Sequence, residues 1–211
     1  MRAARKPLFR LTPGGCQNLL TASRRRECRA QFERSDVLRL PGVLAPELLR
    51  DMQRKLAGEE FSKFVNGTRA RCLVPMGTPQ FFLNFLFSGD SFLAAVESVT
   101  GCRLAPKVSG RVFKMVSAAD HFITWHSDLI EARVLSMTVN LSPRPFKGGR
   151  LQLRHVPSGK IDSYEYGEAG DGFLFRLSKD LEHQSTAVTG KNPKIIYTCW
   201  FPGEARQGAS A

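Results

Sequence analysis

The pattern of apolar and polar positions changes character near residue 107. Beyond that point, short apolar stretches are separated by turn residues, which is typical of all-β barrels and double-sheet jelly rolls. Eight such stretches are present, and eight strands are enough to close a roll of two sheets. The predicted strands cover residues 108–116, 122–126, 134–141, 150–156, 161–166, 172–176, 184–188 and 194–201.

Before residue 107, apolar residues recur mainly at helical spacing. The predicted elements are a basic helix over 23–32, a strand over 36–40, a helix that opens at Pro46, and a helix capped by Ser88 or Asp90 that ends at Gly101. Residues 61–87 give no clear pattern. The expected fold class is therefore mainly β with flanking helices: a jelly roll with N-terminal helical support.

A chain of 211 residues is long enough to bury one hydrophobic core. It contains no internal repeat and nothing that suggests a second folding unit. Prolines and glycines leave residues 1–21 without periodicity, so this segment is expected to be a basic N-terminal arm. The predicted organisation is an arm over 1–21, a single domain over 22–202 with helical support at 22–106, and a C-terminal tail over 203–211.

Positive charge is concentrated at the start of the chain. The formal net charge is +12, and residues 1–30 contain eight Arg or Lys residues against Glu27 alone. A solvated basic helix face and a loose terminus explain this excess most simply. The alternative is a docking surface for a protein or nucleic acid.

The five cysteines are widely spaced and include no Cys-x-x-Cys pair, which indicates reduced thiols and a cytoplasmic location. No apolar run approaches 18 residues, and the first residues contain no uninterrupted apolar segment. We therefore expect neither a membrane span nor a secretory signal. An Arg-rich, acid-poor start leaves an organelle transit peptide open as an alternative.

The candidate chemistry lies in Trp125-His126-Ser127-Asp128 and in His183, which is 57 residues beyond His126. Side chains two apart on a strand point to one face, so His126 and Asp128 can aim at a common point. With His183 from a neighbouring strand they would form the two-histidine, one-carboxylate triad of non-haem Fe(II) sites. A His-x-Asp triplet alone is a weak signal.

The motifs around this triplet strengthen the prediction of a metal site. Residues 107–202 resemble the double-stranded β-helix of the Fe(II)/2-oxoglutarate-dependent oxygenases, most closely the prolyl-4-hydroxylase-like branch. Besides the His126–Asp128 pair, the similar segments are Gly148–Leu153, Gly170–Phe175 before the distal histidine, and the closing strand Lys194–Trp200. The resemblance implies His126, Asp128 and His183 as metal ligands, Fe(II) as the metal, 2-oxoglutarate as cosubstrate and O2 as oxidant.

The family also requires a cation for the far carboxylate of 2-oxoglutarate, usually on the last strand. Lys194 fits, because it shares a strand face with the weakly polar or apolar Ile196, Thr198 and Trp200, and a buried ammonium needs an anionic partner. Lys191 is the rival, although Gly190 and Asn192-Pro193 place it in a turn. The simpler alternative is a surface lysine on an edge strand.

The sequence departs from the family where many relatives have tyrosines. Lys114-Met115-Val116-Ser117 precedes the metal pair without one, and Asn140 replaces the other. Thr138, Asn140 and Thr198 are the candidate substitutes for cosubstrate contacts. Arg176, directly after Phe175, is a candidate grip on an acidic substrate, and Trp200 is a candidate pocket wall.

Three function classes are compatible with these features. The favoured one is hydroxylation of a small molecule, such as an amino acid or natural-product intermediate, because the chain is compact and has no recognition domain. Halide-transferring relatives have a small residue where this chain has Asp128. The second is the same chemistry on a protein or nucleic acid docked by residues 1–30. Nucleic-acid demethylases of the superfamily have a second arginine soon after the cosubstrate cation, whereas here the next one is Arg206. The third is a non-enzymatic jelly-roll or cupin-like binding protein.

Overall fold

The computed structural model describes residues 6–117, 120–130 and 132–204. Its helices are α1 (Ala22–Ser35), α2 (Pro46–Ala57), α3 (Gln80–Phe87) and α4 (Asp90–Thr100). The first seven strands are β1 (Phe9–Thr12), β2 (Gly15–Asn18), β3 (Val37–Leu40), β4 (Phe61–Asn66), β5 (Ala70–Pro75), β6 (Arg103–Leu104) and β7 (Ser109–Met115). They are followed by β8 (Phe122–His126), β9 (Arg133–Asn140), β10 (Leu151–His155), β11 (Ile161–Tyr164), β12 (Gly172–Arg176), β13 (Leu181–Ser185) and β14 (Lys194–Glu204).

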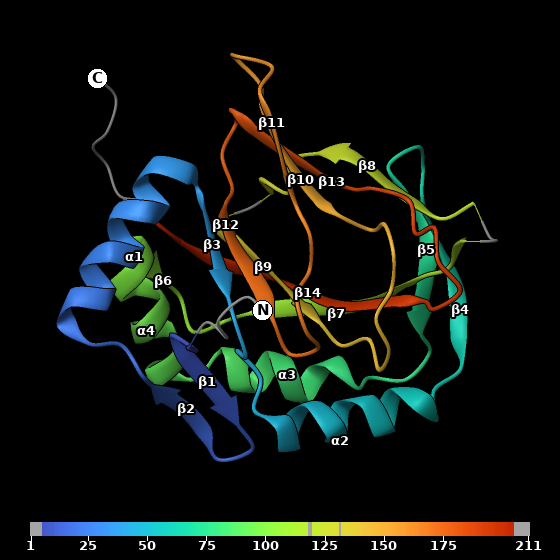
Figure 1. Cartoon of the computed structure of the whole chain (residues 1–211), viewed down its shortest axis with the longest axis horizontal. Coiled ribbons are helices and arrows are strands. Elements are labelled where there is room, and N and C mark those ends of the chain that lie inside the picture. The colour runs from blue at the N-terminus through green and yellow to red at the C-terminus, as the bar shows by residue number, and fades with distance from the viewer. Residues whose placement is uncertain (1–5, 118–119, 131, 205–211) are drawn as a thin grey trace.

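Most strands belong to one curled antiparallel sheet with the order β11-β10-β13-β8-β5-β7-β14-β9-β12-β3 (Figure 1). The link between its two halves is short, since β8 pairs with β5 only through Ile123 with Ala70 and Phe122 with Arg71. The sheet folds over at this link, so that β8, β10, β11 and β13 face the longer half. The expected jelly roll is confirmed.

The predicted strand boundaries hold for β8 and β12 but not for β13, which covers residues 181–185 instead of 184–188. In β13, Leu181 and His183 are buried and face the roll, and His183 pairs with both Leu153 and His126. The apolar Val188, which suggested a later strand, forms only an isolated bridge with Gly148.

The helices cover one side of the longer half-sheet (Figure 1). Helix α2 buries Leu48, Met52 and Leu56 on one face, as their spacing predicts. Each such side chain contributes about 1.5–3 kcal/mol through burial. Helix α4 ends at Gly101 in the left-handed region (φ 74°), as expected, but its N-cap is Gly89 instead of Ser88 or Asp90.

The N-terminal segment differs from the expected arm over residues 1–21. Residues 9–18 form a hairpin, β1–β2, and Leu8, Phe9 and Leu11 are buried in the core. The Leu11 N–H donates to the Val43 carbonyl, and the Ala45 N–H donates to the Leu11 carbonyl. Strands of four residues beside prolines and glycines are too short to display a clear alternation, which is why periodicity did not reveal them. Residues 1–5 of the expected arm lie outside the described residues.

At the other end, β14 continues to Glu204, so the first two residues of the expected tail over 203–211 extend the last strand. Residues 205–211 lie outside the described part of the chain. Cys16, Cys28, Cys72 and Cys199 are free thiols. Within the described ranges, no helix has the length and apolar character needed to cross a membrane.

Candidate metal centre and cosubstrate pocket

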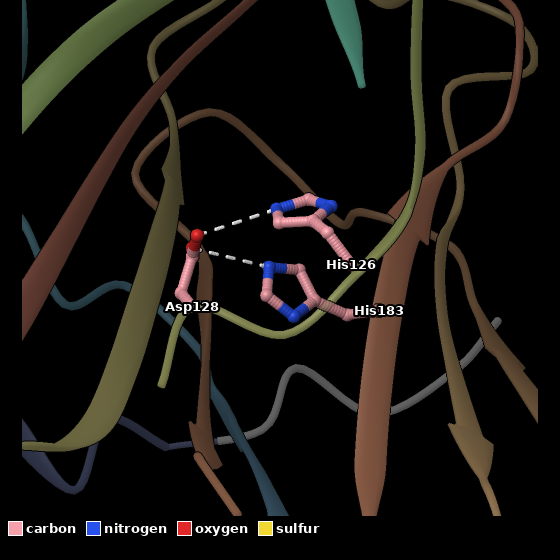
Figure 2. Close-up of side chains that lie close together, drawn as sticks. All are labelled: His126, Asp128 and His183. Atoms are coloured by element: carbon pink, nitrogen blue, oxygen red, sulfur yellow. Dashed lines mark ion pairs between the residues drawn. The ribbon is translucent and has the colours of Figure 1, made fainter. Parts of the chain in front are cut away.

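The structure brings together the three side chains that the sequence selected as metal ligands (Figure 2). His126 ends β8 and lies directly opposite His183 of β13, so both imidazoles occupy the same face of the sheet. Asp128 lies two residues beyond the end of β8, and its side chain points toward the two histidines. Its Oδ1 lies 3.5 Å from His126 Nε2, and its Oδ2 lies 3.3 Å from His183 Nε2.

Two further contacts orient these ligands. His126 Nδ1–H donates to the Thr124 carbonyl at 2.7 Å, which leaves Nε2 free to face the centre. Trp200 Nε1–H donates to Asp128 Oδ2 at 2.6 Å and holds the carboxylate after it leaves the strand. Contacts of this kind fix ligand orientation and tautomer in metal sites.

The protonation states of the centre are set by burial and by the mutual contacts of the ligands. Burial raises the pKa of Asp128, but hydrogen bonds from His126 and His183 outweigh burial and hold the pKa well below its usual range. Burial lowers the pKa of His183. Burial also lowers the pKa of His126, but the hydrogen bond and charge of Asp128 reverse this, so the net shift is upward. The carboxylate is thus anionic at neutral pH, as a cation ligand must be.

The donor set fits a single divalent ion. The ligand atoms lie within 4.8 Å of one another. Two metal–ligand bonds of about 2.1 Å at right angles place their ligand atoms roughly 3 Å apart, so side-chain adjustments can close the site on an ion. Two imidazoles and one carboxylate on one side of the ion leave the other positions open, as in non-haem Fe(II) centres.

The ligands border a cavity of about 280 Å³ that is lined by residues from both halves of the curled sheet. Four of the residues expected around a cosubstrate or substrate line it: Thr138 from β9, and Lys194, Thr198 and Trp200 from β14. Phe64, Asn66 and Ala70 of the β4–β5 hairpin close another side. The segment that gave no clear pattern in the sequence therefore forms part of the cavity wall.

Lys194 is a buried cation in this cavity, with a side chain that is 0% exposed. Its Nζ donates to the Gly149 carbonyl at 2.7 Å and to Ser185 Oγ at 2.8 Å, and lies 4.5 Å from the centre of the Tyr166 ring. No carboxylate of the described residues forms an ion pair with it. Burial lowers the pKa of Lys194 to about 7. An ammonium in these surroundings lacks the anion that would offset its desolvation.

The turn Gly148–Gly149 makes this lysine site possible. Both residues have positive φ, 71° and 60°, which side chains other than glycine rarely adopt. A Cβ on Gly149 would lie 2.7 Å from Lys194 Cδ, and one on Gly148 would collide with the Ala187 carbonyl oxygen. The Gly-Gly motif thus lets the backbone approach Lys194 closely enough to accept its hydrogen bond.

Two predicted contact residues lie elsewhere. Asn140 does not line the cavity; its Nδ2 lies within 3.2 Å of the Gly167 carbonyl and 3.4 Å of the Glu168 carbonyl, and its Oδ1 accepts from the Ser142 N–H. Arg176 also lies outside the lining, because its Nε donates to Asp36 Oδ1 at 2.7 Å. Both side chains therefore form hydrogen bonds within the protein outside the cavity lining.

Tyr166 is a cavity residue that the sequence analysis did not select. Its hydroxyl lies 2.9 Å from Thr138 Oγ1, and its ring lies beside the Lys194 ammonium. It follows β11 in the chain, whereas the tyrosines of many relatives are expected on the strands before and after the metal pair. The sequence signal that could have indicated Tyr166 is an aromatic residue with a hydroxyl at the end of a predicted strand.

Comparisons with known proteins agree with this geometry. Residues 112–202 match the family model described as the 2OG-Fe(II) oxygenase superfamily, and this segment contains the three candidate ligands and Lys194. The comparison with curated protein sequences gave no match.

Similar solved structures include an oxidoreductase of the 2OG-Fe(II) oxygenase family from Burkholderia pseudomallei, with a TM-score of 0.65 and 16% identity over 87% of this chain and 94% of that one. A prolyl-4-hydroxylase from Pseudomonas putida has a TM-score of 0.63 and 17% identity, over 86% and 100% of the two chains. The non-haem α-ketoglutarate-dependent epimerase SnoN from nogalamycin biosynthesis has a TM-score of 0.63 and 16% identity, over 90% and 89%. At these identities the likeness establishes the fold.

A jelly roll that gathers two imidazoles and a carboxylate beside an enclosed cavity defines the class of non-haem metal-dependent oxygenases. The match to the 2OG-Fe(II) oxygenase superfamily covers residues 112–202 and includes all three of these side chains. This match agrees with the resemblance seen in the sequence, and the prolyl-4-hydroxylase from Pseudomonas putida is similar in fold. The protein is an enzyme, and its expected cofactors, Fe(II), 2-oxoglutarate and O2, are those of the matched superfamily.

Proposed function

We propose that this enzyme is a dioxygenase that hydroxylates an unactivated C–H bond of a small molecule, such as an amino acid or a natural-product intermediate. When bound, iron and 2-oxoglutarate supply the oxidising chemistry: one oxygen atom of O2 enters succinate, CO2 is released, and the other oxygen atom enters the C–H bond. The enclosed cavity beside the three ligands is the observation that carries this proposal.

The residues of this chain would divide the work. His126, Asp128 and His183 would hold the metal, and Trp200 would keep the carboxylate in place. Lys194 would pair with the far carboxylate of 2-oxoglutarate, with the Tyr166 hydroxyl and Thr138 beside it. A buried ammonium without an acidic partner among the described residues supports this assignment.

The size of the cavity supports a small substrate. Pockets for small ligands commonly have volumes of about 300–1,000 Å³, and at about 280 Å³ this cavity lies near the lower limit. The β4–β5 hairpin supplies part of its wall, so an incoming group must pass a structured rim. The names of the similar solved structures include different reactions, since one is a prolyl-4-hydroxylase and another is an epimerase from nogalamycin biosynthesis.

The alternative, docking of a protein or nucleic acid by basic residues 1–30, has less support. Among the described residues of this segment, none lines the cavity. Part of the charge of α1 is neutralised locally, because Arg24 pairs with Glu27 and Arg29 pairs with Glu33. The free thiols of Cys16, Cys28, Cys72 and Cys199 agree with a cytoplasmic location, which we include in the proposal.

The test is the release of succinate by purified protein supplied with Fe(II) and 2-oxoglutarate. We expect slow release without any substrate, its loss in His126→Ala and Asp128→Ala, and its retention in His155→Ala, which removes an imidazole outside the cavity. Persistent release in the first two variants would refute the metal assignment. Stimulation by basic peptides but by no free amino acid or small metabolite would refute the small-molecule substrate.

A further inference from the structure

Three arginines line the cavity in addition to Lys194: Arg69, Arg111 and Arg133. They come from separate parts of the fold, namely the β4–β5 turn, β7 and the start of β9. Among the described residues, Asp128 is the one carboxylate in the lining, and it belongs to the metal centre. Across residues 6–117, 120–130 and 132–204, no acidic side chain forms an ion pair with any of the three arginines. The cavity thus carries cations that the described structure does not neutralise.

The backbone ties these arginines to the site. Arg111 lies directly opposite Thr198 in the β7–β14 pair, so it shares the face of the sheet that lines the cavity. The Arg69 carbonyl accepts the Thr124 N–H at 2.8 Å, two residues before the ligand His126. The position of Arg69 therefore depends on the same strand that positions the metal.

Aromatic rings support two of the guanidinium groups. Arg133 lies over the Trp200 ring, 4.6 Å from its centre, and Arg111 lies over the Phe64 ring, 5.0 Å from its centre. A guanidinium stacked on a ring keeps its N–H groups available in its own plane. That plane is the geometry in which arginine binds a carboxylate or phosphate group through two parallel hydrogen bonds.

Arginines elsewhere on nearby strands are arranged differently. Arg71 pairs with Asp120, and Arg154 pairs with Glu182 while also packing on Trp125. These are aromatic-stacked arginines with an acidic neighbour, whereas Arg111 and Arg133 have the aromatic support without a described acid. A solvated surface charge explains the exposed Arg69, but solvation does not explain why Arg111, which is also exposed, and the half-buried Arg133 are each stacked on an aromatic ring at a cavity.

The arginines lie beside a different part of β14 from Lys194. Thr198, opposite Arg111, is four residues from Lys194, and Trp200, beneath Arg133, is six residues away. At about 3.3 Å per residue these separations correspond to roughly 13 and 20 Å along the strand. A single small cosubstrate held at Lys194 therefore leaves the arginine end for a second ligand.

We propose that the substrate is a small organic anion whose carboxylate or other oxyanion group is bound by Arg111 and Arg133, with Arg69 at the rim. This inference rests on the proposed function and specifies the substrate class for the same site. Arginine binding would fix the anionic end of the substrate and orient its remaining carbons toward the metal. The positive field would also speed the approach of anions at low ionic strength.

The first experiment compares matched pairs of compounds in the succinate assay: free amino acids and organic acids against the corresponding amides, which lack the carboxylate. We expect stimulation only by compounds with a free oxyanion group. Stimulation by the amides to the same extent would overturn the proposal. If wild-type protein releases succinate without substrate but no anion in the panel stimulates it, this inference fails while the proposed function stands. If no succinate forms at all, the proposed function itself fails.

The second experiment uses Arg111→Gln and Arg133→Gln with Arg50→Gln as the matched control, since Arg50 is exposed on α2 outside the cavity. Each cavity variant should raise the KM for the stimulating anion at least ten-fold, and the control should not. Iodide, an anionic quencher, should quench tryptophan fluorescence less in Arg133→Gln than in wild type, while neutral acrylamide should quench both alike. A KM change confined to 2-oxoglutarate, or unchanged iodide quenching, would contradict the assignment.

Discussion

Replacing Lys194 with methionine should weaken 2-oxoglutarate binding and remove its pH dependence above neutrality. The methionine side chain is similar in length and removes only the charge and its two hydrogen bonds, to the Gly149 carbonyl and Ser185 Oγ. If the buried ammonium is the partner of the cosubstrate carboxylate, binding must depend on its protonation. The physical basis is linkage between proton binding and ligand binding.

The sign and size of this effect follow from the lysine environment. Burial lowers the pKa of Lys194 from 10.5 to about 7 in the free protein. Above pH 7 the ammonium loses its proton, so the affinity for an anionic carboxylate falls as pH rises. With a pKa of about 7, the protonated fraction falls from about one half at pH 7 to about one hundredth at pH 9. The affinity should therefore fall roughly 50-fold, or about 2.3 kcal/mol, between these values.

Isothermal titration calorimetry of Mn(II)-loaded protein in the absence of turnover provides the assay. At pH 8, buffers with different ionisation enthalpies should show proton uptake on 2-oxoglutarate binding by wild type and none by Lys194→Met. Lys191→Met is the control, because Lys191 is exposed and does not line the cavity. A wild-type affinity that stays constant from pH 7 to 9, or a methionine variant that keeps the same slope, would refute the reasoning.

Three further predictions test the structure around the centre. Trp200→Phe removes the donor to the metal-ligand carboxylate and should weaken Mn(II) binding about 10- to 100-fold, as measured by electron paramagnetic resonance. Trp125 lies outside the cavity lining, so Trp125→Phe should leave Mn(II) binding unchanged. Gly149→Ala should weaken 2-oxoglutarate binding. The control is Gly159→Ala, which introduces only backbone strain of about 1–2 kcal/mol, because Gly159 has φ 67° and open space for a Cβ. Equal effects of the two substitutions on 2-oxoglutarate binding would contradict the role of the Gly148–Gly149 turn. Phe9→Ala should lower the free energy of unfolding by about 3–5 kcal/mol in guanidinium titrations, and a loss below about 0.5 kcal/mol would mean that the hairpin is not part of the core.

The roll and the three ligands could be predicted because they depend on local patterns. The short β-favouring stretch over residues 122–126 indicated β8, and a two-residue spacing was enough to connect His126 with Asp128. The reason given for that spacing was incomplete, because Asp128 lies beyond the strand end. Its approach to the histidines depends on the hydrogen bond from Trp200, which is 72 residues away in the chain.

The contacts that could not be predicted are those made by side chains distant in sequence. Arg176 seemed available to a substrate until the fold placed Asp36, 140 residues earlier, within 2.7 Å of it. Asn140 looked like a substitute for a cosubstrate-binding tyrosine, but its amide binds the loop that contains Gly167. Tyr166, the tyrosine that does reach the cavity, comes from that same loop. The sequence pattern of a strand predicts which face of the sheet a side chain occupies, but it does not predict which distant residue that side chain contacts.

The geometry of the whole site depends on the register of β14. Lys194 and Trp200 lie on the cavity face of this strand, and the intervening Ile195, Tyr197 and Cys199 point into the core beneath the helices. A shift of one residue would exchange the two faces and move the cation out of the cavity. Tyr197 opposes such a shift, since it stacks on Phe87 and donates its hydroxyl to Asn84 Oδ1 of α3 at 2.6 Å. The N-terminal helices therefore act on the chemistry indirectly, because they fix the strand on which the lysine and the metal-supporting tryptophan are spaced.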